Sequence, residues 1–311
     1  MRRELGAAWG LLLLGVILTV ATRLTGGGDF LSVGNLTNIM AQVCVTAVLA
    51  AGASVVIFGG GIDLSVGSLL AVSAALAAGA LKAGWPVWAA CAAGILTGTA
   101  FGAMNGVLVA WLALPPFIAT LGMMGIARGI TYVYLGGAPL FSFDPSFRAL
   151  AEGRLLGIPA PVIVMVAVFV AGYLLLARTG FGRSVYALGG NEEAARLAGI
   201  PIARMKTAIY ALCGAASGLA GLLLAARLDS AEPQAGDGYE LDAIAAVVMG
   251  GASLSGGEGT IWGSLVGALI MGVVRNGLNL LNVSAYWQKA AIGSIILVAV
   301  WLDVSRRRRH P

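Results

Sequence analysis

Few side chains in this 311-residue sequence could carry out chemistry, and the most conspicuous is a carboxylate between two apolar stretches. Asp63 lies in a glycine-rich segment and is followed two residues later by the hydroxyl of Ser65. An ionised carboxylate at membrane depth is costly and is by default a functional-site hypothesis. The other interpretation is that Asp63 caps the helix that follows, where its charge favours the helix N-terminus. The sequence leaves open whether Asp63 and Ser65 belong to a solute path or gate, or to a helix start.

Polar and aromatic side chains in other apolar stretches are the remaining candidates for contact with a solute. Asn105, Arg275 and Asn276 lie in or at the ends of such stretches, and buried amide and guanidinium groups need partners. Hydrogen bonds between helices are the commoner explanation, and contact with a hydroxyl-rich solute is the alternative. Phe117 follows two prolines and is expected either to face a cavity or, more commonly, to pack in the core. The substrate-path candidates are Asp63, Ser65, Asn105, Phe117 and Asn276.

The sequence offers no recognisable catalytic or metal-binding cluster. His310 is the only histidine and lies in the basic tail, which removes histidine-based sites from consideration. Three cysteines, Cys44, Cys91 and Cys213, lie in apolar stretches without a CxxC pair, so that neither a disulfide framework nor a metal site is expected. No lysine follows the Gly-x-x-x-x-Gly pattern of a phosphate loop. We therefore expect no catalytic site, no metal and no cofactor on this chain, and any ATP hydrolysis must occur on another.

The composition predicts an all-α, polytopic membrane helical bundle. Hydrophobic residues make up 59% of the chain and charged residues 11%, against about 25% in soluble domains. Apolar runs long enough to cross a bilayer, which takes about 20 helical residues, recur along the sequence. The predicted spans number about ten, at 5–22, 38–58, 64–81, 87–112, 117–135, 160–177, 207–227, 241–254, 261–280 and 287–304. The first could also be a signal peptide ending near Ala21, but a retained helix behind Arg2 and Arg3 is preferred. Residues 1–311 thus form a single transmembrane domain.

Glycine is abundant, with 46 residues, and much of it lies inside the apolar runs. Gly98, Gly102 and Gly106 form a small-residue ladder, and Gly263 with Gly267 forms another. Such ladders let membrane helices pack closely. We interpret both as packing surfaces without a further function.

The distribution of Lys and Arg predicts the orientation, because positively charged flanks remain in the cytoplasm. Arg2 and Arg3, the loop 178–206 and the tail from Arg306 to Arg309 are the basic clusters, and ten crossings place all of them inside. Both termini are then cytoplasmic, and segments 136–159 and 228–240 lie on the opposite face. The second segment holds four acidic residues and no Lys or Arg, which indicates a solvated surface or a docking face for an external protein.

Two segments of the chain resemble each other. Val55–Gly67 and Val247–Gly257 both end an apolar span with glycines and continue through a Leu-Ser-x-Gly sequence. Gly-interrupted segments in corresponding positions of two halves point to a substrate site. We predict a possible internal parallel repeat, although two independent glycine-rich turns explain the match equally well.

The basic loop 178–206 contains the signals of a complete short helix. Asn191 is a favourable N-cap, Glu192 and Glu193 place negative charge in the first turn, and Gly199 followed by Pro201 ends the helix. A rigid helix on the cytoplasmic face could enter a groove on a partner protein and transmit its motion, with Ala194 and Ala195 permitting close approach. An interfacial helix without a partner is the alternative.

At this point the sequence resembles a known family. Glu193-Ala194-Ala195-x-x-x-Gly199 is similar to the EAA signature of ABC importer permeases, in which this loop contacts the ATPase subunit. The segment from Gly60 to Ser68 resembles the hallmark of the ribose, xylose and arabinose branch. Segments 117–122, 250–257 and 276–281 also resemble that branch, and the similarity covers roughly residues 35–303.

The resemblance implies the partners and the role of this chain. It implies a permease dimer, homomeric or heteromeric, in a bacterial inner membrane, with a periplasmic or extracellular sugar-binding protein and a cytoplasmic ATPase that binds ATP and Mg²⁺. The ATPase-coupling residues are then Asn191, Glu193, Ala194, Ala195 and Gly199. The expected cargo is a monosaccharide, pentose before hexose, because a neutral polyhydroxyl solute needs hydrogen-bonding partners but no ionic clamp.

Other functions remain as alternatives. The same machinery could import branched-chain amino acids or nucleosides. A self-sufficient secondary transporter or channel is less favoured, because it would need ion-coupling carboxylates inside the bundle, and acidic residues other than Asp63 cluster in loops or at span ends. A membrane enzyme is disfavoured by the lack of a catalytic cluster.

Overall fold

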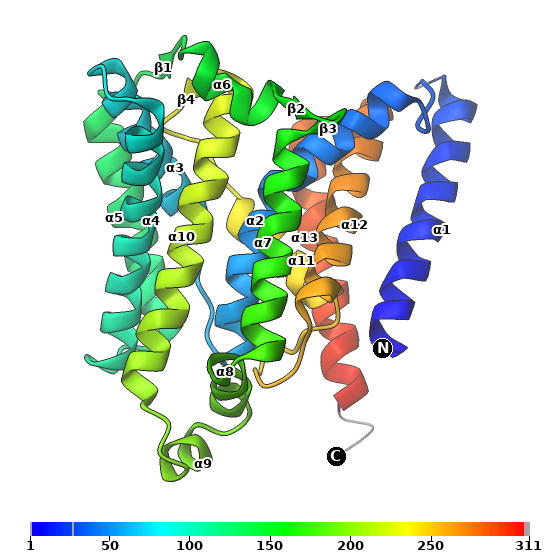
Figure 1. Ribbon diagram of the computed structural model, residues 1–311. Helices are drawn as coiled ribbons and strands as arrows, with labels where there is room; N and C mark the ends of the chain where they lie inside the picture. Colours follow the sequence, from blue (N-terminus) through cyan, green and yellow to red (C-terminus); the bar gives the residue numbers. More distant parts are fainter. Residues whose placement is uncertain (1, 27, 308–311) are drawn as a thin grey trace.

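The computed structural model describes residues 2–26 and 28–307, and in this part of the chain thirteen helices form a single bundle (Figure 1). The long helices are α1 (Arg2–Thr25), α2 (Val33–Phe58), α3 (Val66–Lys82), α4 (Val87–Ala110), α5 (Pro116–Leu135), α7 (Ala160–Arg178), α10 (Ile202–Leu228), α12 (Ile261–Leu280) and α13 (Ala285–Arg307). The shorter helices are α6 (Pro145–Glu152), α8 (Gly180–Gly190), α9 (Glu192–Leu197) and α11 (Tyr239–Met249). Arg308, Arg309 and His310 of the predicted tail lie outside the described residues.

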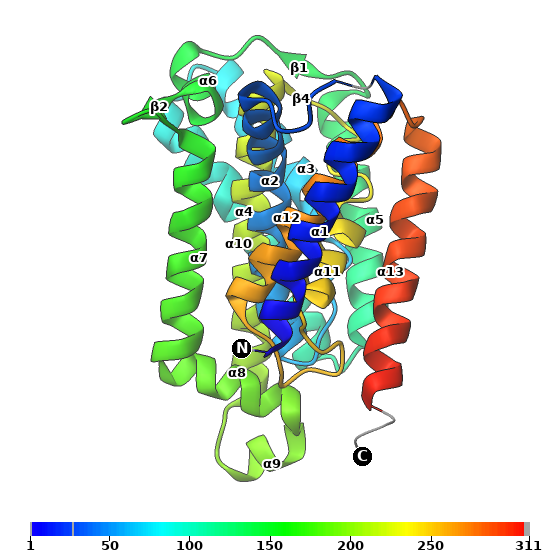
Figure 2. The same cartoon turned by 90° about the vertical axis from the view of Figure 1, so that its right-hand side faces the viewer.

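The two ends of the bundle carry different elements. One end holds α6 and two short antiparallel ribbons, β1 (Leu140–Phe141) with β4 (Ser230–Ala231), and β2 (Arg154–Leu155) with β3 (Ile158–Pro159). The other end holds α8 and α9, together with the beginning of α1 and the end of α13 (Figures 1 and 2). The basic loop, the beginning of α1 and the end of α13 therefore lie at the same end of the bundle.

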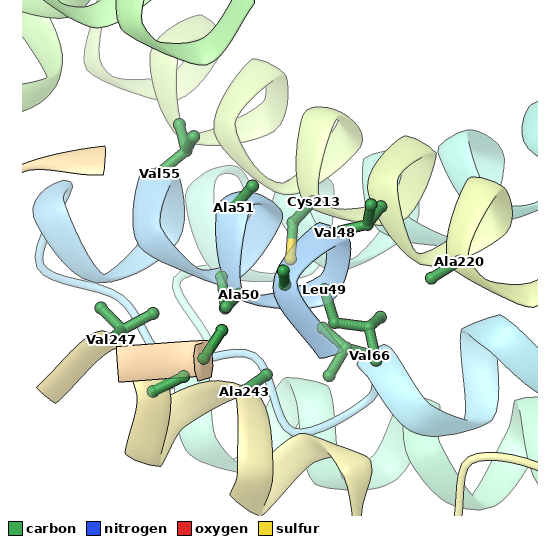
Figure 3. Packing of buried hydrophobic residues seen from close by; sticks show 14 of the residues in the cluster. Val48, Leu49, Ala50, Ala51, Val55, Val66, Cys213, Ala220, Ala243 and Val247 are labelled. Carbon is green, nitrogen blue, oxygen red and sulfur yellow. The ribbon is translucent and has the colours of Figure 1, made fainter. Parts of the chain in front are cut away.

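Helix α2 forms the centre of the bundle. In its most apolar 18-residue window 83% of the residues are buried, against 11% in α1 and 22% in α4. Figure 3 shows Val48, Leu49 and Val55 of α2 among side chains of α3, α10 and α11. The outer helices instead expose large apolar side chains, such as Trp9, Trp88 and Val133, as expected for surfaces in contact with lipid. The distribution of apolar side chains is that of a membrane protein.

Helices α3 and α11 are shorter than their neighbours. Their 17 and 11 residues correspond to about 26 and 16 Å, whereas the 24 residues of α4 extend over about 36 Å. Segment 59–65 leads from the end of α2 to the start of α3, and segment 229–238 leads from the end of α10 to the start of α11 (Figure 1). The second connection reaches the start of α3, because the backbone of Gly236 packs directly on Gly67 in the first turn of that helix. Both short helices therefore begin part-way along the bundle.

The predicted glycine ladder on α4 lies at a close contact between two helices. A Cβ on Gly98 would overlap the carbonyl oxygen of Gly214, and one on Gly102 would overlap that of Tyr210, so that α4 and α10 touch through their backbones. The second ladder also packs closely, since a Cβ on Gly267 would overlap Ala246 of α11. Both ladders lie at close helix contacts, as predicted.

Each of the ten predicted spans coincides with one long helix or with α11. Seven helices are long and apolar enough to cross a membrane, counted over the described residues, and α3 falls short of them in length. The largest boundary differences are five residues: α2 begins at Val33 rather than at residue 38, α10 begins at Ile202 rather than at residue 207, and α11 ends at Met249 rather than at residue 254. The chain after Met249 leaves the helix because Gly251 adopts φ +93°, a conformation that side chains disfavour.

Candidate functional site

Asp63, Ser65 and Asn105 form one buried hydrogen-bonded cluster at the start of α3. The Asp63 carboxylate oxygen Oδ1 accepts hydrogen bonds from the Ser65 backbone N–H at 2.8 Å and from the Ser65 hydroxyl at 2.6 Å. The Asn105 amide Nδ2 donates to the Ser65 hydroxyl at 2.8 Å, which joins α4 to this cluster. All three residues are at most 2% exposed. The structure thus brings three of the five path candidates together.

The cluster is not a conventional helix cap. Ser65, not Asp63, occupies the N-cap position of α3, and its side chain makes no capping hydrogen bond. The Asp63 carboxylate also interacts with the thiol of Cys213 on α10 and with the Asn105 side chain, whereas Asn105 Oδ1 is buried without a hydrogen-bond donor. Because native proteins pair nearly all buried polar atoms, a buried carboxylate beside an unpaired amide oxygen distinguishes this cluster from ordinary packing.

The segment before this cluster is held by a tyrosine that the sequence reasoning missed. Gly60 has φ +79°, which permits the chain to reverse after α2, and the Ile62 carbonyl then accepts from the Tyr210 hydroxyl at 3.4 Å. A Cβ on Gly61 would lie 2.6 Å from that hydroxyl. A tyrosine in a long apolar helix carries no distinctive sequence signal, so only the fold identifies Tyr210 as a neighbour of Asp63.

The other two path candidates lie elsewhere. Asn276 of α12 exchanges two hydrogen bonds with Asn35 of α2, at 3.0 and 2.8 Å. Hydrogen bonding between helices is the commoner explanation that the sequence analysis gives for a buried amide. Phe117 lies in the first turn of α5 and is 51% exposed. Neither residue shares a hydrogen bond with the Asp63 cluster.

Helix α9 has the predicted caps. The Asn191 side chain accepts a hydrogen bond from the backbone N–H of Ala194 at 2.9 Å. Glu192 and Glu193 occupy the first turn, and Gly199 follows the helix with φ +81°. The Glu192 carboxylate lies 2.7 Å from the Lys206 ammonium at the start of α10, which fixes α9 relative to that helix. The prediction of a capped short helix is confirmed, with helical residues from Glu192 to Leu197.

The two alanines of α9 face different environments. Ala195 is only 3% exposed, so it packs against the protein itself, whereas Ala194 is exposed. Leu197, which the sequence reasoning did not single out, is 83% exposed. An apolar side chain this exposed at the end of a short helix is available to a partner. Glu193, Ala194 and Leu197 form the free face of α9, and the exposed Arg196, which lies 3.6 Å from Glu193, borders it.

A second helix, α8, precedes α9 and was not predicted. Its sequence contains four glycines, a composition that favours a loop over a helix. Thr179 provides its N-cap, with a side chain that accepts from the Gly182 N–H, and Val185 and Leu188 are buried on one face. Val185 and Leu188, three residues apart, have the spacing of an amphipathic helix, but the four glycines of the segment favour a loop.

Helix α8 ends in a backbone contact that we call the glycine junction, formed by residues 58–60, 189–190 and 256–257. A Cβ on Gly189 would overlap the Phe58 carbonyl oxygen and lie 2.5 Å from the Gly257 nitrogen. The Gly257 N–H donates to that same carbonyl at 2.9 Å. A Cβ on Gly256 would lie 2.7 Å from the Cα of Gly60. The two segments predicted to form a repeat thus touch at one end of the bundle.

The glycine junction borders a cavity of about 210 Å³ next to α9. Its lining includes Gly59–Gly61, Gly189–Glu192, Lys206 and Tyr210. One cavity therefore contacts the break after α2, the start of α9 and the tyrosine that holds Ile62. Among the described residues no group of three His, Cys, Asp or Glu side chains could hold a metal ion.

Arg128 and the ion pair of Arg275 with Asp242 are charged groups inside the bundle that the sequence does not single out as functional. Arg128, midway along α5, donates to the carbonyl oxygens of Pro233 at 2.8 Å and Ala235 at 2.7 Å, and so fixes segment 229–238. Arg275 of α12 pairs with the buried Asp242 of α11 at 2.5 Å. A charged residue within an apolar span is itself the signal that could have found Arg128.

The fold and the site together define a polytopic helical membrane protein with broken helices and a capped helix at one end. The description "Branched-chain amino acid transport system / permease component" belongs to the family whose sequence pattern matches residues 35–300. The chain belongs to this family. No solved structure matches it.

Several relatives are similar over nearly their whole length. The chain is 48% identical to the ribose import permease protein RbsC of Escherichia coli (strain K12), over 94% of this chain and 92% of the relative. It is 46% identical to RbsC of Bacillus subtilis (strain 168), over 97% and 92%. The L-arabinose ABC transporter permease protein AraH of Azospirillum brasilense is 37% identical, over 99% and 92%.

Proposed function

We propose that this chain is the membrane-spanning subunit of an ATP-driven importer that moves a monosaccharide into the cytoplasm. The similarity to ribose import permeases over 94% of the chain carries this proposal. Relatives named for arabinose and xylose widen the cargo class to pentoses and related sugars. The chain itself is a transport subunit and not an enzyme, and ATP with Mg²⁺ is bound by a separate cytoplasmic ATPase. An external sugar-binding protein and a second permease copy complete the assembly.

The free face of α9 supports the assignment of the ATPase contact. Asn191 and Gly199 terminate the helix, Ala195 and the ion pair from Glu192 to Lys206 fix it to the bundle, and Ala194 stays exposed. The partner therefore docks on the face of Glu193, Ala194 and Leu197. The glycine junction then transmits the displacement of α9 to the breaks before α3 and after α11.

We propose that the Asp63 cluster fixes the position of the break between α2 and α3. Asp63, Ser65 and Asn105 join the start of α3 to α4, and the unpaired Asn105 Oδ1 can take a donor when the segment moves. Phe117 and Asn276 line the path only if the neighbouring helices rearrange. The connection from α2 to α3 and the connection from α11 to α12 lie at the same end of the bundle. We therefore also propose that these two helix pairs form a parallel repeat.

Uptake by a reconstituted assembly tests the proposed function. The wild-type permease, its ATPase and its binding protein are placed in vesicles with radiolabelled ribose, xylose, arabinose, galactose, leucine or adenosine outside. We expect ATP-dependent accumulation of a sugar, pentoses first. Accumulation of leucine or adenosine without any sugar would assign the cargo to the alternative class, and uptake without the ATPase would indicate a secondary transporter.

Ten crossings, with α8 and α9 in the cytoplasm, are proposed for the topology. The basic loop, the start of α1 and the end of α13 lie at one end of the bundle, while β4 lies at the other. Single cysteines at Asn191 and Asp237, in a chain without Cys44, Cys91 and Cys213, are expected to react with an impermeant thiol reagent from opposite sides. Reaction of both cysteines from outside would contradict this topology.

A further inference from the structure

Segment 229–238 is attached to the bundle in different ways along its length. At the end that faces outward in the proposed topology, β4 pairs with β1, and the Asp229 carboxylate accepts a hydrogen bond from the Phe143 backbone N–H at 2.8 Å. Residues 233–238 then form turns that lead inward to the start of α11 (Figure 1). The hydrogen bonds within these turns join residues three positions apart, so they shape the turns without attaching them to other helices. Contacts with other helices must therefore hold this inner part, residues 233–238, in place.

Arg128 of α5 holds the inner part through two charge-assisted hydrogen bonds. Its guanidinium Nη1 donates to the Pro233 carbonyl at 2.8 Å and to the Ala235 carbonyl at 2.7 Å. Arg128 lies seven residues before the end of α5, which corresponds to about 10 Å along the helix. A charged side chain at such a depth in a membrane span is costly and commonly marks a functional site. The cost indicates that holding these two carbonyls matters for function.

Two further contacts of the inner part are weaker. Asp237 pairs with Lys289 of α13 at 3.3 Å, but both side chains are largely exposed, and exposed ion pairs contribute little to stability. Gly236 packs on Gly67 through the backbone, without a side chain that would interlock. Gly236 and Gly238 have φ +72° and +83°, so the chain can turn at both positions. Loss of the Arg128 hydrogen bonds would therefore release the inner part.

The inner part lies between the external end of the bundle and the Asp63 cluster. Gly67, on which Gly236 packs, is two residues after Ser65 of that cluster. The segment approaches the cluster from the end of the bundle that carries β4 (Figure 1). A solute that moves from outside toward the Asp63 cluster therefore meets this segment first.

Helix α11 connects the same segment to the glycine junction. It begins directly after the segment, at Tyr239, and residues 256–257 of the junction follow its end at Met249 within eight positions. A Cβ on Gly267 of α12 would overlap the Ala246 carbonyl oxygen, so α11 packs tightly on α12. A displacement of the junction by α8 and α9 is therefore carried along about 16 Å of helix to the segment.

We propose that segment 229–238 is the external gate of the solute path and that Arg128 is the positioning residue that keeps it closed. The proposal rests on the proposed function, because it takes the chain to be a permease driven by an ATPase at α9. When α9 moves, the glycine junction and α11 draw the Pro233 and Ala235 carbonyls away from Arg128. Water that enters from outside then hydrates the freed guanidinium, and the exposed pair of Asp237 with Lys289 separates in the same step.

Amide hydrogen exchange of the complete assembly in nanodiscs tests the gate. Exchange in residues 234–238 of the wild-type permease is compared without nucleotide and after trapping with ATP and vanadate. We expect the rates in the two states to differ about tenfold or more, because opening the gate breaks two hydrogen bonds to a charged group. Residues 98–106, at the contact of α4 with α10, should exchange equally in both states.

Variants of Arg128 test the positioning role. Arg128→Met removes both hydrogen bonds and should raise exchange in residues 234–238 about tenfold or more without nucleotide. Uptake should fall while ATP hydrolysis continues, because the gate no longer closes. Arg128→Lys keeps the charge but lacks the planar guanidinium, so an intermediate rise is expected. Gly125→Ala on the preceding turn of α5 is the matched control, because a Cβ there meets nothing within 4 Å.

Equal exchange in the two nucleotide states of the wild type would overturn the gate, and this comparison needs no variant. Exchange in Arg128→Met that equals the wild-type rate would overturn the role of Arg128. A rise that extends to residues 98–106 would also overturn it, since Arg128 would then stabilise the whole bundle. Sugar uptake by the wild-type assembly is measured separately. Uptake with unchanged exchange refutes the gate alone, whereas ATP-independent uptake refutes the proposed function.

Discussion

Replacement of Gly189 by alanine is expected to reduce solute uptake roughly tenfold or more while the permease remains inserted and bound to its ATPase. The added methyl group would overlap the Phe58 carbonyl oxygen and approach the Gly257 nitrogen, and neither backbone can move without shifting α2 or the segment after α11. Overpacking of this kind costs about 1–3 kcal/mol, and a factor of ten corresponds to 1.4 kcal/mol. If the junction must re-form in each cycle, uptake falls roughly tenfold or more.

Gly190→Ala is the matched control for this prediction. Gly190 is the next residue, and a Cβ built on it meets nothing within 4 Å, so near-normal uptake is expected. ATP hydrolysis and uptake are measured together in the same vesicles. Hydrolysis that continues without uptake in Gly189→Ala supports transmission through the glycine junction, and normal uptake in that variant would remove this role.

Replacement of Gly214 by alanine is expected to destabilise the whole bundle. A Cβ at this position would overlap the Gly98 carbonyl oxygen and lie 2.9 Å from the Cα of Gly102, so α4 and α10 must separate. The expected cost is about 1–3 kcal/mol, and a leucine in the same place should prevent folding. The control is Gly122→Ala on α5, where a Cβ meets nothing within 4 Å and alanine favours the helix.

The native thiols provide the measurement. Cys44 and Cys213 are fully buried, so that in a chain whose half-buried Cys91 is replaced by serine a thiol-reactive fluorophore labels them only when the bundle opens. The temperature of half-maximal labelling should fall by several degrees in Gly214→Ala and stay unchanged or rise in Gly122→Ala. Equal temperatures in the two variants would show that the α4 and α10 contact can relax without loss of stability.

Local signals in the sequence were sufficient for the features that one segment determines. The apolar runs predict where helices lie, and Asn191 with Gly199 predicts the ends of α9, because capping depends on residues within a few positions. The glycine ladder on α4 indicates close packing because its small residues recur at helical spacing within one segment. The boundaries that were missed, such as the end of α11 at Met249, depend on which residues of a glycine-rich run turn first.

The site itself depends on contacts between distant segments, which a single sequence does not contain. Asp63 and Ser65 are neighbours in the chain, but nothing local indicates that Asn105 donates to Ser65. The pairing of Asn276 with Asn35 is equally nonlocal, and it is what separates Asn276 from the other path candidates. The glycine junction joins three segments through their backbones, so no side-chain pattern could indicate it.

The burial of α2 has a consequence for how the protein is made. Its surroundings are supplied by α7, α10, α11 and α12, all of which emerge from the ribosome after it. At about 5–20 residues per second, α10 follows on the order of ten seconds later. During that interval α2 must reside in lipid or beside the insertion machinery without its final neighbours. The apolar sequence from Val43 to Phe58 allows α2 to remain in lipid until its neighbours are synthesised. The same apolar side chains first contact lipid and later form the core of the bundle.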